Sequence, residues 1–212
     1  LFDSGQQDVL LALLDELQPY DIASLLPSLA PDEQRRLVSL LAPEVAAEAM
    51  EHLDVDDQYR IVDHLEQEKA RQILAAMSSD AVVDLAGAIH PLQARALLDL
   101  VPEEKRVRIE RLMTYPENSV GALMTVEYLA VREGWTADQV IAHFRKVGAR
   151  VEVANYVYVV DGQGHLVGVA SLRDVLLSPP DTPMSEIMYT KVISVPVDAD
   201  QEVAARLLSQ YD

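Results

Sequence analysis

Residues 164–177 read GHLVGVASLRDVLL, and the run before them, at 156–164, reads YVYVVDGQG. Both runs are rich in β-branched and aromatic residues, which is typical of strands, and the Asp-Gly-Gln-Gly segment between them predicts a hairpin turn. The second run continues without a break into LRDVLL, whose apolar spacing predicts a helix. We therefore expect two antiparallel strands, over 153–161 and 165–171, and a helix over 172–177.

Three glycines in this stretch have two different expected roles. Gly162 and Gly164 belong to the turn, where a backbone without a Cβ atom reverses direction most easily. Gly168 lies inside the second strand, where the missing side chain lets a ligand or another backbone approach closely. We therefore expect a close contact at Gly168.

The residues before this stretch complete a β-α-β-β-α unit. VEYLAV at 126–131 predicts a short strand, Thr136 a helix N-cap, and residues 137–147 the helix itself. A turn-rich linker, TYPENSVGALMT, precedes the unit at 114–125.

The sequence from 181 onward repeats the beginning of that unit. With a shift of 64 residues and no gap, Met124 aligns with Met188 and Thr136 with Asp200. This second copy, at 181–212, stops at Asp212 before its own hairpin. Together with the absence of Met at position 1, this indicates a fragment of a longer protein.

The first half of the chain follows a different period, of twelve residues. One register is apolar throughout and holds Leu17, Leu29, Leu41, Leu53, Leu65, Met77, Ile89 and Val101. Another apolar register lies eight residues later, and the position two residues after the first register holds Pro19, Pro31, Pro43 and Pro91. Proline and nearby acidic residues both favour the first turn of a helix. We therefore expect one short helix of about two turns per repeat, stacked into an all-helical superhelix over about 5–113.

Composition limits the classes of function. The chain has 35 acidic and 17 basic residues, a net charge of −18 that would repel a nucleic acid or an anionic membrane, so cations are the natural counterpart. Residues 1–113 hold 22 of the acidic and 10 of the basic residues. No cysteine is available for disulfides or thiolate metal sites, and no apolar run approaches the ~20 residues that cross a bilayer. A P-loop, a Gly-x-Ser-x-Gly motif and a metal-hydrolase histidine motif are missing, so we expect no enzyme.

The second half resembles a CBS domain followed by the start of its tandem partner. The resemblance rests on Gly168, Ser171 and Asp174, whose Gly-x-x-Ser-x-x-Asp pattern is that family's ligand signature. CBS pairs often bind adenine nucleotides. The resemblance therefore implies that Asp174 holds the ribose, Arg173 a phosphate and Tyr156 the base of ATP or another adenine nucleotide. The alternative is that Ser171 is a simple helix cap and Asp174 an exposed first-turn acid.

The whole chain, from the acidic repeats through YPENSVGALMT to DADQEVAARLLSQYD, is similar to the cytosolic part of the MgtE family of magnesium channels and transporters. The similarity implies an α+β multi-domain protein. Its parts would be a right-handed all-α superhelix at 1–113, a linker with the first CBS segment at 114–125, the first CBS domain at 126–180 and the start of a second at 181–212. It also implies a homodimer formed through the CBS domains, a transmembrane pore later in the same protein, and a place on the cytoplasmic face of the cell membrane.

The same similarity implies a magnesium sensor, in which Mg²⁺ between acidic residues of the helical and CBS domains favours a closed pore. The implied ligands, side chains except for the backbone carbonyl of Ser209, are Glu48, Asp80, Asp84, Asp200, Glu202, Ser209 and Asp212. For Asp200 the alternative is a helix N-cap. Two other functions stay open, an adenine-nucleotide sensor that regulates another enzyme or transporter, and a protein-interaction scaffold.

Overall fold

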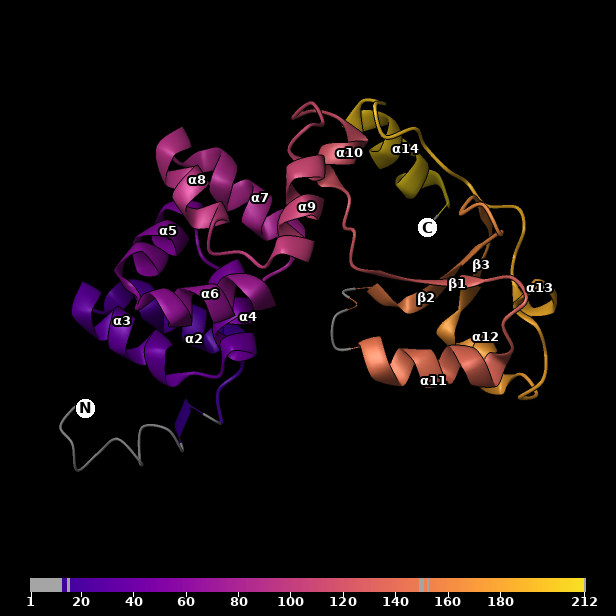
Figure 1. Ribbon diagram of the computed structural model, residues 1–212, viewed down its shortest axis with the longest axis horizontal. Helices are drawn as coiled ribbons and strands as arrows, with labels where there is room; N and C mark the ends of the chain where they lie inside the picture. Colours follow the sequence, from indigo (N-terminus) through magenta and orange to yellow (C-terminus); the bar gives the residue numbers. More distant parts are fainter. Residues whose placement is uncertain (1–12, 15, 149–150, 152, 212) are drawn as a thin grey trace. The chain divides into compact units, whose positions relative to one another are not determined.

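The computed structural model describes residues 13–14, 16–148, 151 and 153–211. The chain divides into two compact units, a helical unit up to Tyr115 and a mixed unit from Pro116 onward. Figure 1 shows the helical unit in indigo to magenta and the mixed unit, which combines helices with a small sheet, mostly in orange to yellow.

The helices of the helical unit confirm the twelve-residue period. They are α2 (Pro19–Leu25), α3 (Pro31–Leu40), α4 (Pro43–Glu51), α5 (Val55–His64), α6 (Gln67–Ala76), α7 (Ser79–Ala88), α8 (Pro91–Leu98) and α9 (Glu103–Leu112). Each begins two residues after the apolar register, where the sequence places it. Four of them begin with proline, whose missing N–H would have no partner in a first helical turn.

Helices two apart in sequence pack against each other, as α2 does on α4, α3 on α5, α4 on α6, α5 on α7 and α7 on α9. The core between them contains the fully buried side chains of Ile22, Met50, Ile73, Leu85 and Ile109. Leu25, eight residues after Leu17, belongs to the second apolar register, but it does not lie in the core. Leu25 is 45% exposed, because α2 ends there and the 3-10 turn η1 (Leu26–Ser28) places Leu26 in the core instead.

The mixed unit confirms the β-α-β-β-α order. Its elements are α10 (Val120–Leu123), β1 (Tyr128–Arg132), α11 (Ala137–Val147), β2 (Val153–Val160), β3 (Leu166–Ser171), α12 (Leu172–Leu177), α13 (Met184–Ile187) and α14 (Gln201–Tyr211). The sheet order is β1-β2-β3, with β1 parallel to β2 and β2 antiparallel to β3. The segment predicted as a turn-rich linker differs from expectation, because it contains the one-turn helix α10.

Helices α11 and α12 cover the same side of the sheet (Figure 1). Val140 of α11 and Val175 of α12 pack into one core with Val157, Val159 and Ala170 of the sheet. This packing fixes the position of α12, and therefore of the residues that follow β3.

The predicted cap and turn residues are confirmed. The Oγ1 of Thr136 accepts a hydrogen bond from the N–H of Gln139, and the Gln139 side chain accepts one from the N–H of Thr136 at 3.0 Å. In the hairpin, Gly164 has a φ of 88°, in the left-handed region that glycine adopts most easily.

The 64-residue repeat is visible in the backbone hydrogen bonds that join the two copies. Residues 118–121 bond to 197–201, and their counterparts 64 residues later, 182–185, bond to 133–137. The matched N–H donors and carbonyl acceptors, at 2.7–3.1 Å, are Val120 to Ala199 and Met184 to Trp135, Gly121 to Val197 and Ser185 to Glu133, and Gln201 to Asn118 and Ala137 to Thr182. We call this pattern the reciprocal exchange, because each copy holds the first segment of the other.

The second copy reproduces the helices of the first but not its strand. Helices α13 and α14 begin 64 residues after α10 and α11. The counterpart of β1, at 192–196, forms no strand in the described part of the chain, because β1 pairs with β2 and this sequence holds no second copy of β2. Helix α14 likewise buries none of its described residues.

Candidate nucleotide and cation sites

The residues implied for nucleotide binding lie at one end of the β2–β3 pair. Tyr156 of β2 is the register partner of Ser171, which ends β3 and is the N-cap of α12. Arg173 and Asp174 follow in the first turn of α12, and the side chains of Tyr156, Arg173 and Asp174 are all exposed. The strand register therefore brings Tyr156 beside the start of α12.

Ser171 fixes the carboxylate of Asp174. The Oγ of Ser171 accepts a hydrogen bond from the N–H of Asp174 at 3.0 Å and donates one to its Oδ2 at 2.6 Å. The alternative interpretation of Ser171 as a helix cap is thus confirmed. An ionised carboxylate has about four acceptor positions, so Asp174 keeps capacity for further donors such as ribose hydroxyls.

Gly168 makes room for a side chain of the same unit. A Cβ atom at Gly168 would lie 2.7 Å from the Cγ of Met188, which is too close for two carbon atoms. Next to it, Tyr189 and Val169 exchange backbone hydrogen bonds at 2.7 and 2.9 Å. The close contact expected at Gly168 is present, but its partner is Met188 from the second copy rather than a ligand.

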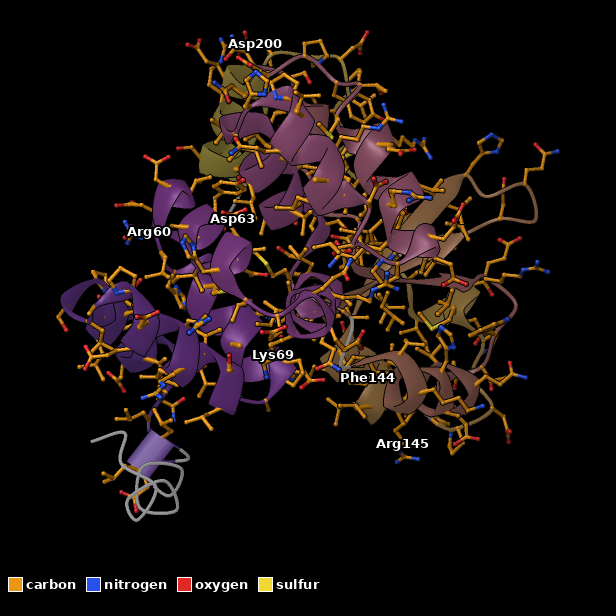
Figure 2. The ribbon with its side chains drawn as sticks, turned by 60° about the vertical axis from the view of Figure 1, so that its left-hand side comes forward. Arg60, Asp63, Lys69, Phe144, Arg145 and Asp200 are labelled. Atoms are coloured by element: carbon orange, nitrogen blue, oxygen red, sulfur yellow. The ribbon has the colours of Figure 1, made fainter. Side chains whose placement is uncertain are left out.

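The implied ligands of the second copy lie on and just before α14. The Oδ1 of Asp200 accepts a hydrogen bond from the N–H of Glu202 at 2.8 Å, so the interpretation of Asp200 as a helix cap is confirmed. Asp200, Glu202 and Ser209 are not buried, and Figure 2 labels Asp200. Asp212 lies outside the described residues. A capping carboxylate keeps its second oxygen for another ligand.

The implied ligands of the helical unit lie on two helices. Glu48 is exposed on α4, whereas Asp80 is half-buried as the second residue of α7, with Asp84 exposed one turn later. Within the described ranges, no three His, Cys, Asp or Glu side chains lie close enough together to hold a metal ion. Helix α4 offers one of these carboxylates and α7 offers two. One or two carboxylates are enough for Mg²⁺, because this ion keeps several of its water ligands.

Two charged residues at the junction before α7 were not predicted from the sequence. Glu51 of α4 accepts a hydrogen bond from the N–H of Ser78 at 2.6 Å. Lys105 of α9 is only 6% exposed, and its Nζ donates to three backbone carbonyls at the end of α6, those of Leu74, Ala75 and Met77. For Lys105, the signal that the sequence offered is a lysine at the third position of a repeat helix.

Asp80 and Lys105 both act electrostatically on Glu51. Burial raises the pKa of the Glu51 carboxyl above its usual range, and the charge of Asp80 raises it further. The hydrogen bonds from Ser78 and the charge of Lys105 act in the opposite direction and lower it. The Glu51 carboxylate at the junction before α7 is therefore influenced by charges on both α7 and α9.

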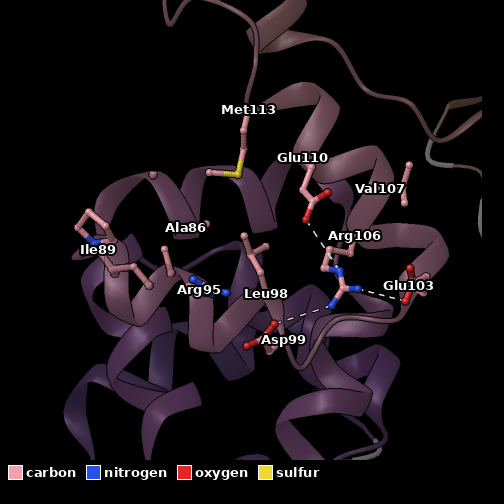
Figure 3. Close-up of a pocket in the computed structure, with 13 residues that line it drawn as sticks. Ala86, Ile89, Arg95, Leu98, Asp99, Glu103, Arg106, Val107, Glu110 and Met113 are labelled. Carbon is pink, nitrogen blue, oxygen red and sulfur yellow. Dashed lines mark hydrogen bonds and ion pairs between the residues drawn. The ribbon is translucent and has the colours of Figure 1, made fainter.

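A groove of about 700 Å³ lies elsewhere on the helical unit, along α7, α8 and α9. Arg106 lies across it and forms ion pairs with Asp99 at 3.8 Å, Glu103 at 3.1 Å and Glu110 at 3.9 Å, as Figure 3 shows. Ile89 and Leu98 are among its apolar lining residues. Of the residues predicted for nucleotide or Mg²⁺ binding, none that the structure describes lines this groove.

Comparisons with known proteins identify the family. The family model of the MgtE intracellular N domain matches residues 17–118, and that of the CBS domain matches residues 120–181. A crystal structure of the cytosolic domain of the Mg²⁺ channel MgtE in complex with ATP is 37% identical, covers 98% of this chain and 85% of that chain, and has a TM-score of 0.90. The chain belongs to the MgtE family.

Other MgtE relatives agree with this assignment. The magnesium transporter MgtE of Thermus thermophilus is 37% identical over 98% of this chain and 47% of the relative. That of Bacillus subtilis is 28% identical over 95% of this chain and 45% of the relative. The crystal structure of the soluble part of a magnesium transporter is 29% identical over 98% of this chain and 87% of that chain, with a TM-score of 0.78. The chain thus spans about half the length of the curated relatives that it matches.

These matches confirm the resemblance drawn from the sequence and the order of a helical domain followed by a CBS domain. The matched relatives are magnesium transporters and a Mg²⁺ channel rather than enzymes. Across the described residues, we find no helical stretch with the length and hydrophobicity that a bilayer crossing requires.

Proposed function

We propose that this chain is the Mg²⁺-sensing regulatory region of a magnesium channel or transporter, in which Mg²⁺ bound by acidic residues of both units favours a closed pore. The similarity to the cytosolic domain of the Mg²⁺ channel MgtE, with a TM-score of 0.90 at 37% identity, carries the proposal. In this role the chain lies on the cytoplasmic face of the cell membrane.

The charge of the chain supports a role for divalent cations. With a net charge of −18, any two acidic surfaces of this protein repel each other. Two carboxylates 4 Å apart repel by about 4 kcal/mol at an effective dielectric constant near 20. A divalent cation between them converts that repulsion into attraction, so the ion concentration controls whether acidic surfaces can associate.

The proposed ligands come from both units. In the helical unit they are the carboxylates of Glu48, Asp80 and Asp84, and in the mixed unit those of Asp200, Glu202 and Asp212 with the backbone carbonyl of Ser209. Asp200 uses its Oδ1 for the cap of α14, so Oδ2 is the atom that we assign to the ion. Carboxylate and carbonyl oxygens are the ligands that Mg²⁺ prefers.

A second proposed property is the binding of ATP or another adenine nucleotide. The similar Mg²⁺ channel domain was crystallised with ATP, which favours this property over the interaction scaffold. Tyr156, Arg173 and Asp174 are the residues that we assign to base, phosphate and ribose. An adenine-nucleotide sensor for another enzyme or transporter is the alternative function.

Two further assignments complete the proposal. The chain forms a homodimer through its CBS domains, and it is continued by a transmembrane pore of the same protein. The Thermus thermophilus relative, of which this chain covers 47%, supports a longer protein of this kind.

Limited proteolysis tests the proposal directly. We expect millimolar Mg²⁺ to protect the 113–125 linker, and we expect Asp80→Ala combined with Asp200→Ala to abolish that protection. Matched controls are Asp63→Ala, which removes an exposed acid of α5, and Asp138→Ala, which removes the 64-residue counterpart of Glu202. If Mg²⁺ changes nothing while ATP protects the linker, the nucleotide-sensor alternative replaces the proposal.

A further inference from the structure

The first 115 residues contain two lysines, Lys69 and Lys105, which lie 36 residues and therefore three repeats apart. Both are the third residue of their helix, α6 or α9. The Nζ of Lys69 donates to the carbonyl of Leu41 at 2.5 Å, and that of Lys105 donates to the carbonyl of Met77. Leu41 and Met77 are the C-caps of α3 and α6, and they are also 36 residues apart. The two lysines thus make equivalent contacts in two parts of the superhelix.

Each anchored carbonyl lies two residues before the next helix, which is α4 after Leu41 and α7 after Met77. These two helices carry all three acids that we propose as Mg²⁺ ligands in the helical unit, Glu48 on α4 with Asp80 and Asp84 on α7. The lysine contacts therefore occur at the junctions that lead into the proposed ligand helices.

Acidic neighbours accompany both lysines. Burial lowers the pKa of Lys69, and the negative charge of Glu44 on α4 raises it. Asp80 lies 36 residues after Glu44 and belongs with Lys105 to the charges that act on Glu51. Glu51 adds a second restraint to the α7 junction through its hydrogen bond from the N–H of Ser78.

Because Lys105 is buried, its contact with the end of α6 restricts the movement of that helix end. A buried ammonium group is tolerated only where hydrogen bonds and negative charge replace its lost water. Lys105 finds both at the end of α6, where the terminal carbonyls carry the negative end of the helix dipole. The end of α6 therefore cannot move relative to α9 without leaving the ammonium group unsolvated.

We propose that Lys105, and to a smaller extent Lys69, are positioning residues of the Mg²⁺ sensor, which fix the junctions from which α7 and α4 present the ligand carboxylates. This inference rests on the proposed function. Neither lysine contacts the ion. Each acts through the backbone that precedes the ligand helix.

The direction of the effect separates positioning from charge. Deleting a positive charge close to carboxylates strengthens the attraction for Mg²⁺ by electrostatics alone. Loss of positioning weakens the response, because the carboxylates no longer meet the ion in a fixed geometry. Replacing Lys105 with a neutral residue therefore gives opposite results for the two roles.

The test measures the Mg²⁺ concentration that half-protects the 113–125 linker from proteolysis, together with thermal stability. We expect Lys105→Met to raise this concentration about fivefold, which is typical of residues that modulate coupling, and Lys69→Met to raise it less. In an Asp80→Asn, Asp84→Asn background, Lys105→Met should cause no further change. Lys69→Met should likewise add nothing in a Glu48→Gln background.

Gln58→Met is the matched control. Gln58 is 5% exposed and donates from Nε2 to the carbonyl of Leu53 at 2.9 Å, two residues before α5, which carries none of the proposed ligands. We expect Gln58→Met to lower thermal stability and to leave the half-protecting Mg²⁺ concentration unchanged.

The inference is overturned if Lys105→Met lowers that concentration or leaves it unchanged, if Gln58→Met raises it equally, or if the effect persists without Asp80 and Asp84. Should Lys105→Met fail to fold, Lys69→Met decides, because Lys69 is only half-buried and donates to one carbonyl. A wild-type chain that does not respond to Mg²⁺ overturns the proposed function and the inference with it. A wild-type response that Lys105→Met does not alter overturns the inference alone.

Discussion

The contacts that stabilise the helical unit internally differ from those that stabilise the mixed unit. In the helical unit, each helix packs mainly on helices one or two places away in sequence, so its contacts are local. In the mixed unit, the reciprocal exchange joins residues 118–121 to 197–201, at the other end of the unit. The twelve-residue period can be recognised in any short stretch, whereas the exchange becomes apparent only when the two copies are compared.

The largest expected effect tests whether the two units unfold separately. Ile73 is fully buried in the helical unit, and Ile73→Ala should reduce its stability by about 3 kcal/mol through lost burial and a cavity. Trp135 is the one tryptophan of the chain and lies in the mixed unit, so its fluorescence reports that unit alone. We expect denaturant to show a shifted far-UV circular dichroism transition and an unchanged fluorescence transition. Equal shifts in both signals would mean that the units unfold as one.

A smaller effect is expected where the second copy packs on β3. Gly168→Ala places a methyl group against Met188 and should reduce the stability of the mixed unit by about 2 kcal/mol through overpacking. Trp135 fluorescence during urea denaturation measures this loss. Met188→Ala in the same chain should restore part of the stability. If the second substitution only adds to the loss, the two residues are not in the contact described.

The caps of the two repeat-related helices sharpen the comparison within the mixed unit. Thr136→Ala should cost about 1 kcal/mol, because α11 packs on the sheet and its N-cap is lost. Asp200→Ala removes the equivalent cap of α14, which buries none of its described residues, and should cost clearly less. Urea denaturation of both variants without Mg²⁺ measures the difference. Equal losses would show that α14 contributes as much to the fold as α11.

The smallest effect concerns the pH dependence of the β2–β3 hairpin. The Oδ1 of Asp161 accepts hydrogen bonds from the N–H groups of Gln163 and His165 at 2.8 and 2.9 Å. The backbone hydrogen bond from His165 is the main cause that lowers the pKa of Asp161 below its usual value, against the opposing effect of desolvation. Because the folded-state pKa is the lower one, the stabilisation is present above the unfolded-state value and is lost as the pH falls through the folded-state pKa.

Amide hydrogen exchange of the turn residues measures this dependence. Protection in the wild-type turn should fall at acidic pH, and Asp161→Asn should give weaker protection that changes little with pH. An unchanged pH profile in the variant would assign the dependence to another group.

Features that depend on local sequence were predicted well. The starts of α2 to α9, the Thr136 cap and the hairpin follow from neighbouring residues. Features set by distant partners were not. Lys105 bonds to carbonyls 28–31 residues away, and the side chain that fills the space at Gly168 belongs to Met188. Leu25 belongs to an apolar register but is exposed, because a 3-10 turn after α2 shifts the helical period by one residue and buries Leu26 instead.

The candidate sites show the same difference between features set by local sequence and features set by distant partners. Tyr156 and Ser171 lie together because the hairpin register pairs them, and Asp174 follows in the first turn of α12. Their role in nucleotide binding stays a prediction. The joint action of the Mg²⁺ ligands depends on residues from both units, and it stays a prediction. Local patterns identify which residues are available, whereas their combination depends on contacts that no local pattern encodes.

The reciprocal exchange has a mechanical consequence. Residues 118–121 follow directly after the helical unit, yet their backbone is bonded to the segment that begins α14 rather than to the strands of their own copy. A movement of residues 118–121 is therefore passed to the start of α14 through hydrogen bonds, as well as to β1 along the chain. The start of the second copy is thus mechanically connected to residues that precede the first strand, although about 80 residues separate the two segments in sequence.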